Sequence, residues 1–196
     1  MNRARDAAAA TAAYAALTIA LTWPLGAGLA RDVPSDFGDP LLNAWILAWD
    51  ATHLGQRWWN ANIFHPHPLA LAYSEHLLPQ AIQILPFYAA TKNPILCYNL
   101  LFLSTFTFYK QAHLAPLPGR VSAPDVAALY QFIAGLPEPC AIVELPLGEP
   151  AFDVRYVFYS TLHWKRIVNG YSGGAPVEYG QSLFTLTTAE EAPGDA

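Results

Sequence analysis

The chain has 196 residues and a mass of 21.4 kDa, enough for one ordinary domain or for a few membrane spans with a small second domain. Hydrophobic residues make up 54% of it and charged residues 13%, against about 25% charged in a typical globular domain. This low charge density excludes a disordered chain and a nucleic-acid-binding protein, because both depend on dense charge. The net charge of −5 gives no support for an anionic partner, and two cysteines are too few for a disulfide scaffold.

The first feature in chain order is a charge-free run from Ala7 to Ala30, which follows Arg3 and Arg5. A helix needs about 20 apolar residues to cross a bilayer, so this run is long enough to span. The basic residues ahead of it place the amino terminus on the cytoplasmic side. A cleaved signal peptide is the alternative, with residues 28–30 as its small-x-small cleavage site. The length of the run and the apolar segments downstream favour an uncleaved span.

Two shorter charge-free runs cover residues 77–91 and 93–109, with Lys92 at the turn between them. Asn93 followed by Pro94 is a good helix start, because Asn caps a helix and Pro suits its first position. The runs predict a helical hairpin that crosses the membrane. The alternative is a pair of buried helices in a soluble helical protein.

The tail has the pattern of a small α/β domain. Residues 123–136 have helical spacing of apolar side chains, and residues 140–145 form a short apolar run typical of a buried strand. Residues 155–159 fit either a second strand or a helix. A helix leading into an apolar strand suggests an α/β unit, with a parallel sheet possible.

The sequence therefore predicts a mainly α-helical membrane protein with a small C-terminal α/β extracytoplasmic domain, located in the bacterial inner membrane. The predicted parts are a membrane domain (1–110) with spans near 7–30, 77–91 and 93–109, an extracytoplasmic loop (31–76), a linker (111–120) and the α/β domain (121–196).

The loop at 31–76 gathers five acidic residues and four histidines at one predicted bilayer surface. Large apolar residues between Leu41 and Trp49 have helical spacing, which predicts an amphipathic helix lying in the membrane interface. Asp39 directly before Pro40 also fits a plain helix cap. His65 and His67 would share one face of a strand and could bind a metal, but the two prolines beside them favour a loop without one.

These motifs resemble the bacterial integral membrane glycosyltransferases of the GT-C superfamily, relatives of the protein O-mannosyltransferases and lipid A aminoarabinose transferases. The segments that carry the resemblance are residues 21–25, 36–45, 62–66, 71–76, 143–146, 160–164 and 169–173. The resemblance implies an enzyme that takes a sugar from a polyprenyl-phosphate carrier and passes it to an acceptor at the far side of the membrane.

The resemblance also implies roles for individual residues. Asp39 matches the expected general base or metal ligand best, with Asp36 second and Glu75 as a further acid. A divalent cation such as Mg²⁺ or Mn²⁺, held by Asp36 and Asp39, could balance the leaving phosphate. The local side chains that could bind the phosphate instead are Arg57, His65, His67 and His76.

The chain departs from the family in its number of spans. Members typically have many more, and the later ones hold part of the carrier lipid. One alternative is therefore a non-catalytic truncated membrane protein, and another is a periplasmic binding module with a cleaved leader. Self-association would be one way to supply the missing helices.

Overall fold

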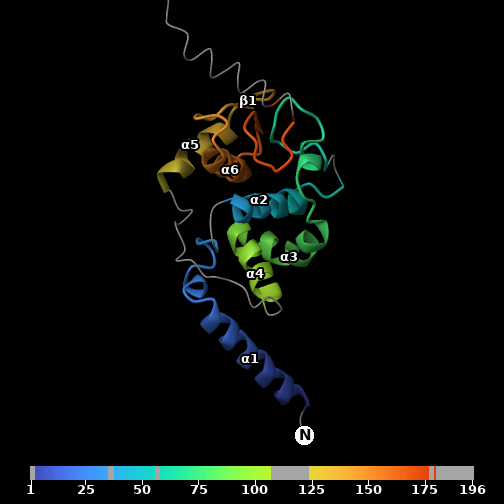
Figure 1. The fold of residues 1–196 in the computed structure, drawn as a ribbon, viewed down its shortest axis with the longest axis vertical. Helices are drawn as coiled ribbons and strands as arrows, with labels where there is room; N and C mark the ends of the chain where they lie inside the picture. The colour runs from blue at the N-terminus through green and yellow to red at the C-terminus, as the bar shows by residue number, and fades with distance from the viewer. Residues whose placement is uncertain (1–2, 35–37, 56–57, 107–123, 177–178, 180–196) are drawn as a thin grey trace, which may run out of the picture.

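The computed structural model describes residues 3–34, 38–55, 58–106, 124–176 and 179 (Figure 1). The elements in chain order are α1 (Arg3–Leu21), η1 (Leu25–Ala27), α2 (Gly38–Thr52), η2 (Ala70–Tyr73), α3 (Leu78–Thr91), α4 (Pro94–Phe106), α5 (Pro124–Ala134), β1 (Ala141–Ile142), α6 (Pro150–Tyr159), η3 (Ser160–Leu162) and β2 (Arg166–Ile167). The predicted linker at 111–120 lies outside the described residues, as do Asp36 and Arg57.

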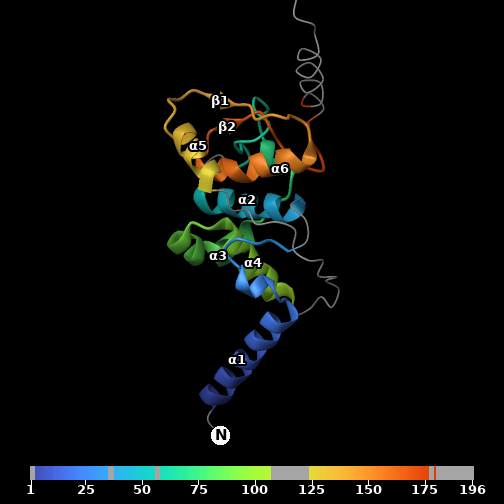
Figure 2. The ribbon, with the colours of Figure 1, turned by 90° about the vertical axis from the view of Figure 1, so that its left-hand side faces the viewer.

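Helix α2 lies at the centre of the fold. Helices α3 and α4 pack on one side of it, and α6 with the two short strands lies on the other (Figures 1 and 2). Every residue from Pro40 to Asp50 except Asn43 is buried. A helix that is apolar on all sides is buried on all sides, so α2 becomes the core of the protein. The prediction of an interfacial helix at this position is wrong, and Trp45 is fully buried inside the protein.

The prediction of three membrane spans is also wrong, and with it that of a multi-pass inner-membrane protein. Among the described residues, no helix is both long and hydrophobic enough to cross a bilayer. Helices α3 and α4 have 14 and 13 residues and are each about 20 Å long, whereas the hydrocarbon core is about 30 Å thick. Helix α1 has 19 residues, but it begins among the charges at Arg3, Arg5 and Asp6. It ends at Leu21 because Pro24 follows shortly after.

The helical hairpin itself is confirmed as α3 and α4. Asn93 caps α4, since its Oδ1 accepts a hydrogen bond from the Leu96 N–H at 2.9 Å. Asn99, which is fully buried, donates to the backbone oxygens of Leu29 at 2.8 Å and Asp32 at 2.7 Å. These bonds hold the chain after α1 against the hairpin, while α1 itself projects away from the remaining helices (Figure 2).

The tail contains a β–α–β unit. Strands β1 and β2 are parallel neighbours, and α6 lies between them in the chain. A bent segment at 62–65 joins the other edge of β2. The Ile167 N–H donates to the Asn62 backbone oxygen at 2.7 Å, and the His65 N–H donates to the Ile167 backbone oxygen at 2.9 Å. One hydrophobic core accordingly holds residues of α2, of this segment and of α6.

Candidate functional site

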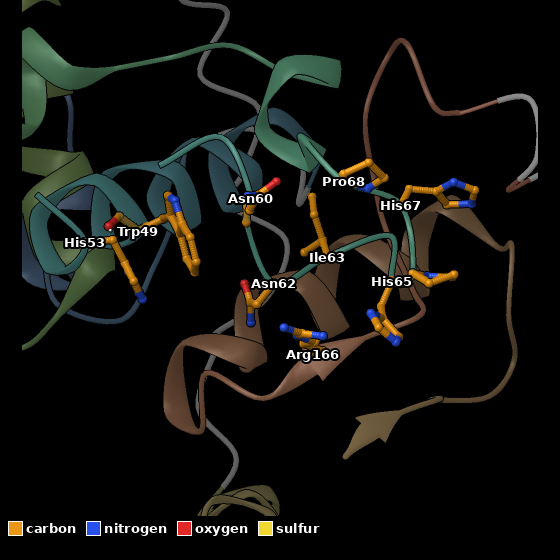
Figure 3. Close-up of a pocket in the computed structure, with 11 residues that line it drawn as sticks. Trp49, His53, Asn60, Asn62, Ile63, His65, His67, Pro68 and Arg166 are labelled. Carbon is orange, nitrogen blue, oxygen red and sulfur yellow. Dashed lines mark hydrogen bonds between the residues drawn. The ribbon is translucent and has the colours of Figure 1, made fainter. Parts of the chain in front are cut away.

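A cavity of about 380 Å³ lies at the C-terminal end of α2 (Figure 3). Its lining comes from α2, from the segment at 60–68 and from β2, which are far apart in the sequence. The lining side chains with polar atoms are Trp49, His53, Asn60, Asn62, His65, His67 and Arg166. Among the described residues that line the cavity, none carries a negative charge.

The segment at 60–68 is anchored by Phe64, whose side chain is fully buried. Its ring packs edge to face against Tyr179, with 4.9 Å between ring centroids, and against Tyr73 at 6.1 Å. The backbone of Phe64 has a φ of 55°, which is unusual for a residue with a side chain. The anchored ring leaves His65 and His67 half-buried at the cavity.

Positive charge is concentrated at one part of the cavity. The pKa of His65 is lowered first by desolvation, then by the neighbouring charges of Arg166 and His67. A cluster of like charges is relieved by an anion, which would favour the protonated imidazole. The cavity therefore suits a negatively charged group.

An aromatic wall forms another side of the cavity (Figure 3). The rings of Trp49 and His53 are stacked at 3.6 Å between centroids, and Trp164 meets Trp49 edge to face at 5.7 Å. The Trp49 indole donates a hydrogen bond to the Trp58 backbone oxygen at 2.9 Å. Partial burial lowers the pKa of His53, and this effect outweighs the hydrogen bond to the Trp49 backbone oxygen, which raises the pKa. The wall is thus a fixed, neutral surface.

Asn62 contributes to the lining as a buried side chain. It is 6% exposed, and its amide nitrogen donates to the Lys165 backbone oxygen at 3.1 Å. Its Oδ1 is buried and has no hydrogen-bond partner among the described residues. A buried acceptor left unpaired costs about 1–3 kcal/mol.

The structure brings together only part of the predicted site. His65 and His67 line the cavity, as the prediction of a ligand-binding role for them requires. Asp39 is exposed in the first turn of α2, about 15 Å along the helix axis from Trp49. Glu75 is exposed and does not line the cavity, and His76 faces a different group, Asp50.

The sequence reasoning missed Arg166 and His53 as residues that line the cavity. Arg166 lies about 100 residues beyond His65 in the chain and reaches the cavity because β2 pairs with the segment at 62–65. No local spacing could have indicated this contact.

The metal prediction has no support in the described part of the chain, where no group of three or more His, Cys, Asp or Glu side chains could hold an ion. Asp36, the proposed partner of Asp39, lies outside that part. A site for Mg²⁺ or Mn²⁺ at this pair stays a prediction.

Comparison with known proteins assigns this chain to no family. No family model matches this chain, and no curated protein or solved structure matches it either. The resemblance to GT-C glycosyltransferases therefore stays a prediction, and function has to be argued from the cavity.

Proposed function

We propose that this chain binds a phosphorylated sugar in the cavity at the end of α2. The observation that carries the proposal is the convergence of His65, His67 and Arg166 on one cavity whose described lining has no acidic side chain. The polyprenyl-phosphate-linked sugar implied by the sequence resemblance belongs to the same chemical class.

The cationic part suits the phosphate. Arginine pairs with phosphate oxygens through two parallel hydrogen bonds, and such charge-assisted bonds are about twice as strong as neutral ones. His65 adds a donor once an anion favours its protonated form, and the His67 ring can donate a further hydrogen bond. The overall charge of −5 does not oppose this, because charges beyond about 8 Å are largely screened at physiological salt.

The remainder of the cavity suits the sugar. Its volume of about 380 Å³ is within the range of small-molecule sites, which runs from about 300 to 1,000 Å³. The His53 ring, stacked against the buried Trp49, offers a flat surface, and the exposed Asn60 amide offers polar atoms for a hydroxyl. A sugar ring presents both an apolar face and hydroxyl donors.

The proposal is a binding function. Sugar transfer would also need a base beside the acceptor, and Asp39 lies near the other end of α2 from this cavity. A phosphorylated sugar is therefore proposed as a ligand that is bound, without its transfer to an acceptor.

The test is a calorimetric titration with glucose 1-phosphate. Arg166→Ala should weaken binding by about tenfold or more, since a hydrogen bond to a charged group contributes about 1.5–3 kcal/mol. Arg31→Ala is the matched control, because both arginines are exposed and Arg31 does not line the cavity. Inorganic phosphate, titrated separately, measures the part of the affinity that the cationic side chains supply. Equal affinities for the wild type and Arg166→Ala, or no binding by the wild type, would overturn the proposal.

A further inference from the structure

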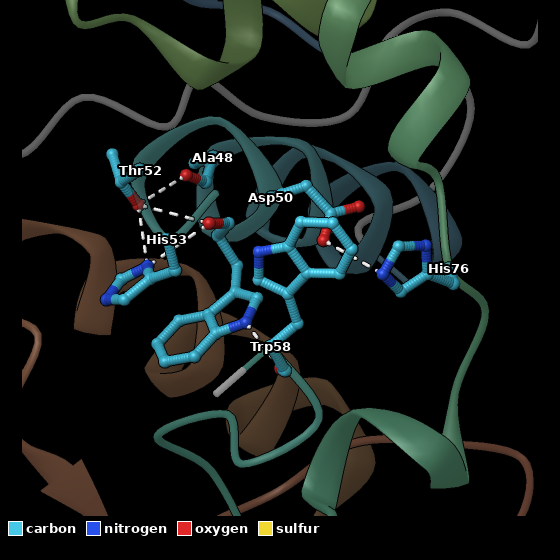
Figure 4. A network of polar contacts seen from close by, with 7 residues as sticks. Ala48, Asp50, Thr52, His53, Trp58 and His76 are labelled. Atoms are coloured by element: carbon cyan, nitrogen blue, oxygen red, sulfur yellow. Dashed lines mark hydrogen bonds and ion pairs between the residues drawn. The ribbon is translucent and has the colours of Figure 1, made fainter. Parts of the chain in front are cut away.

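A second cluster lies on another side of α2, where Asp50 is fully buried (Figure 4). Burial is the main cause that raises the pKa of this carboxyl group, while the charge of His76 and the N–H of Leu77 act to lower it. Neither carboxylate oxygen has a hydrogen bond of good geometry among the described residues. A buried, poorly paired carboxylate is costly, and such groups are concentrated at functional sites.

The group that faces Asp50 is an imidazole. The Nε2 atom of His76 lies 3.5 Å from Asp50 Oδ1, close enough for an ion pair and slightly long for a hydrogen bond. Catalytic hydrogen bonds are often this long without a ligand and shorten when one binds. Because Nε2 faces Asp50, the second ring nitrogen, Nδ1, lies on the side of the ring away from the carboxylate (Figure 4).

Two tryptophans flank the imidazole. The ring centroid of Trp59 lies 5.2 Å from that of His76, and the centroid of Trp58 lies 5.8 Å from it. The Trp59 side chain is 48% exposed, whereas His76 is 21% exposed. An exposed indole beside a partly exposed imidazole offers an apolar face and a polar atom together, which matches one face of a sugar ring.

We propose that Trp59 and His76 form a second binding site, for an uncharged hydroxylated ring such as a sugar, with Asp50 as the positioning residue. Asp50 accepts the Nε2–H of His76 and so fixes the tautomer in which Nδ1 carries a lone pair. The ligand packs on Trp59, and one of its hydroxyls donates to Nδ1. This site does not depend on the phosphate-binding cavity.

Binding is tested with methyl glycosides of glucose, mannose and galactose, followed by saturation-transfer NMR. At least one of them should bind, Trp59→Ala should weaken it by about tenfold or more, and His76→Gln should do the same. Trp23→Ala is the matched control, because Trp23 is also an exposed tryptophan, at 62%, and lies just after α1. Glycoside binding that Trp59→Ala leaves unchanged would belong to the phosphate-binding cavity instead.

The role of Asp50 is tested by ¹⁵N NMR of the His76 ring. The wild type should show the Nε2–H tautomer, and Asp50→Asn should give a mixture of tautomers together with weaker glycoside binding. No glycoside binding, equal binding by Trp59→Ala and the wild type, or an Nδ1–H tautomer in the wild type would each overturn the proposal. The wild-type spectrum and the two surface variants decide the matter even where Asp50→Asn does not fold.

Discussion

Replacement of Gly170 by alanine should destabilise the protein, because the backbone here lies directly against a buried ring. A methyl group added at Gly170 would overlap the side chain of Phe64. That ring is fully buried and held between Tyr179 and Tyr73, so it has no free space to move into. The clash must be relieved by a shift of the segment that carries His65 and His67.

The expected loss of unfolding free energy is about 1–3 kcal/mol, the usual cost of inserting a methyl group into a packed core. For a domain of this size, that lowers the melting temperature by about 2–12 °C. Urea unfolding followed by tryptophan fluorescence measures the free energy, and calorimetry measures the melting temperature.

Gly173→Ala is the control, because no atom of the described residues, the chain neighbours aside, lies within 4 Å of a methyl group at that position. It should change the unfolding free energy by no more than about 0.5 kcal/mol. If Gly170→Ala proved as stable as Gly173→Ala, the packing of Phe64 against the chain at 170 would not be as described. The anchoring of the binding segment would then need another explanation.

Three further results are expected. Burial, aided by the charge of Lys165, lowers the pKa of His163 to about 4. As the pH falls from about 6.5 to about 4, the unfolded state therefore binds a proton at this histidine and the native state does not. Over that pH range the free energy of unfolding, measured in urea, should fall by about 3 kcal/mol more in the wild type than in His163→Phe. An equal fall in both proteins would contradict the burial of His163. Sulfate keeps its charge over the same pH range, so its affinity for the cavity should rise as the pH falls and His65 becomes protonated. The rise should be smaller in His65→Gln than in the wild type. If calorimetry found the same pH dependence of sulfate affinity in both, His65 would not bind the anion. Asn169→Ala should lower the free energy of unfolding by about 2–5 kcal/mol, because the buried amide makes three hydrogen bonds. Its nitrogen donates to the Glu144 backbone oxygen at 2.8 Å and to Asp153 Oδ1 at 2.9 Å, and its oxygen accepts from the Glu144 backbone N–H at 2.8 Å. A loss below about 1 kcal/mol in urea unfolding would show that these groups find other partners.

The helices could be predicted from local patterns, but their surroundings could not. Asn93 and Pro94 start α4 as the capping rule expects, and α5 follows the spacing found at residues 123–136. An apolar run predicts that a helix is shielded from water, but it does not indicate whether protein or lipid surrounds the helix. The run at Leu41–Trp49 satisfies this with α3, α4 and α6 as neighbours, where the sequence reasoning had assumed lipid.

The candidate sites likewise combine residues that the sequence indicated with residues that only the fold brings to them. His65 and His67 stood out because histidines between prolines are conspicuous in a sequence. Arg166 reaches them through strand pairing, and His76 reaches Asp50 from 26 residues further along the chain. Such non-local contacts depend on the whole topology, which composition and spacing do not determine.

The most direct test of the phosphate-binding cavity is a crystal structure of the protein soaked with glucose 1-phosphate. The account predicts density for the phosphate within hydrogen-bond distance of the Arg166 guanidinium and the His65 ring, with the sugar against the His53 ring. A fully occupied ligand bound elsewhere, with this cavity left to solvent, would contradict it.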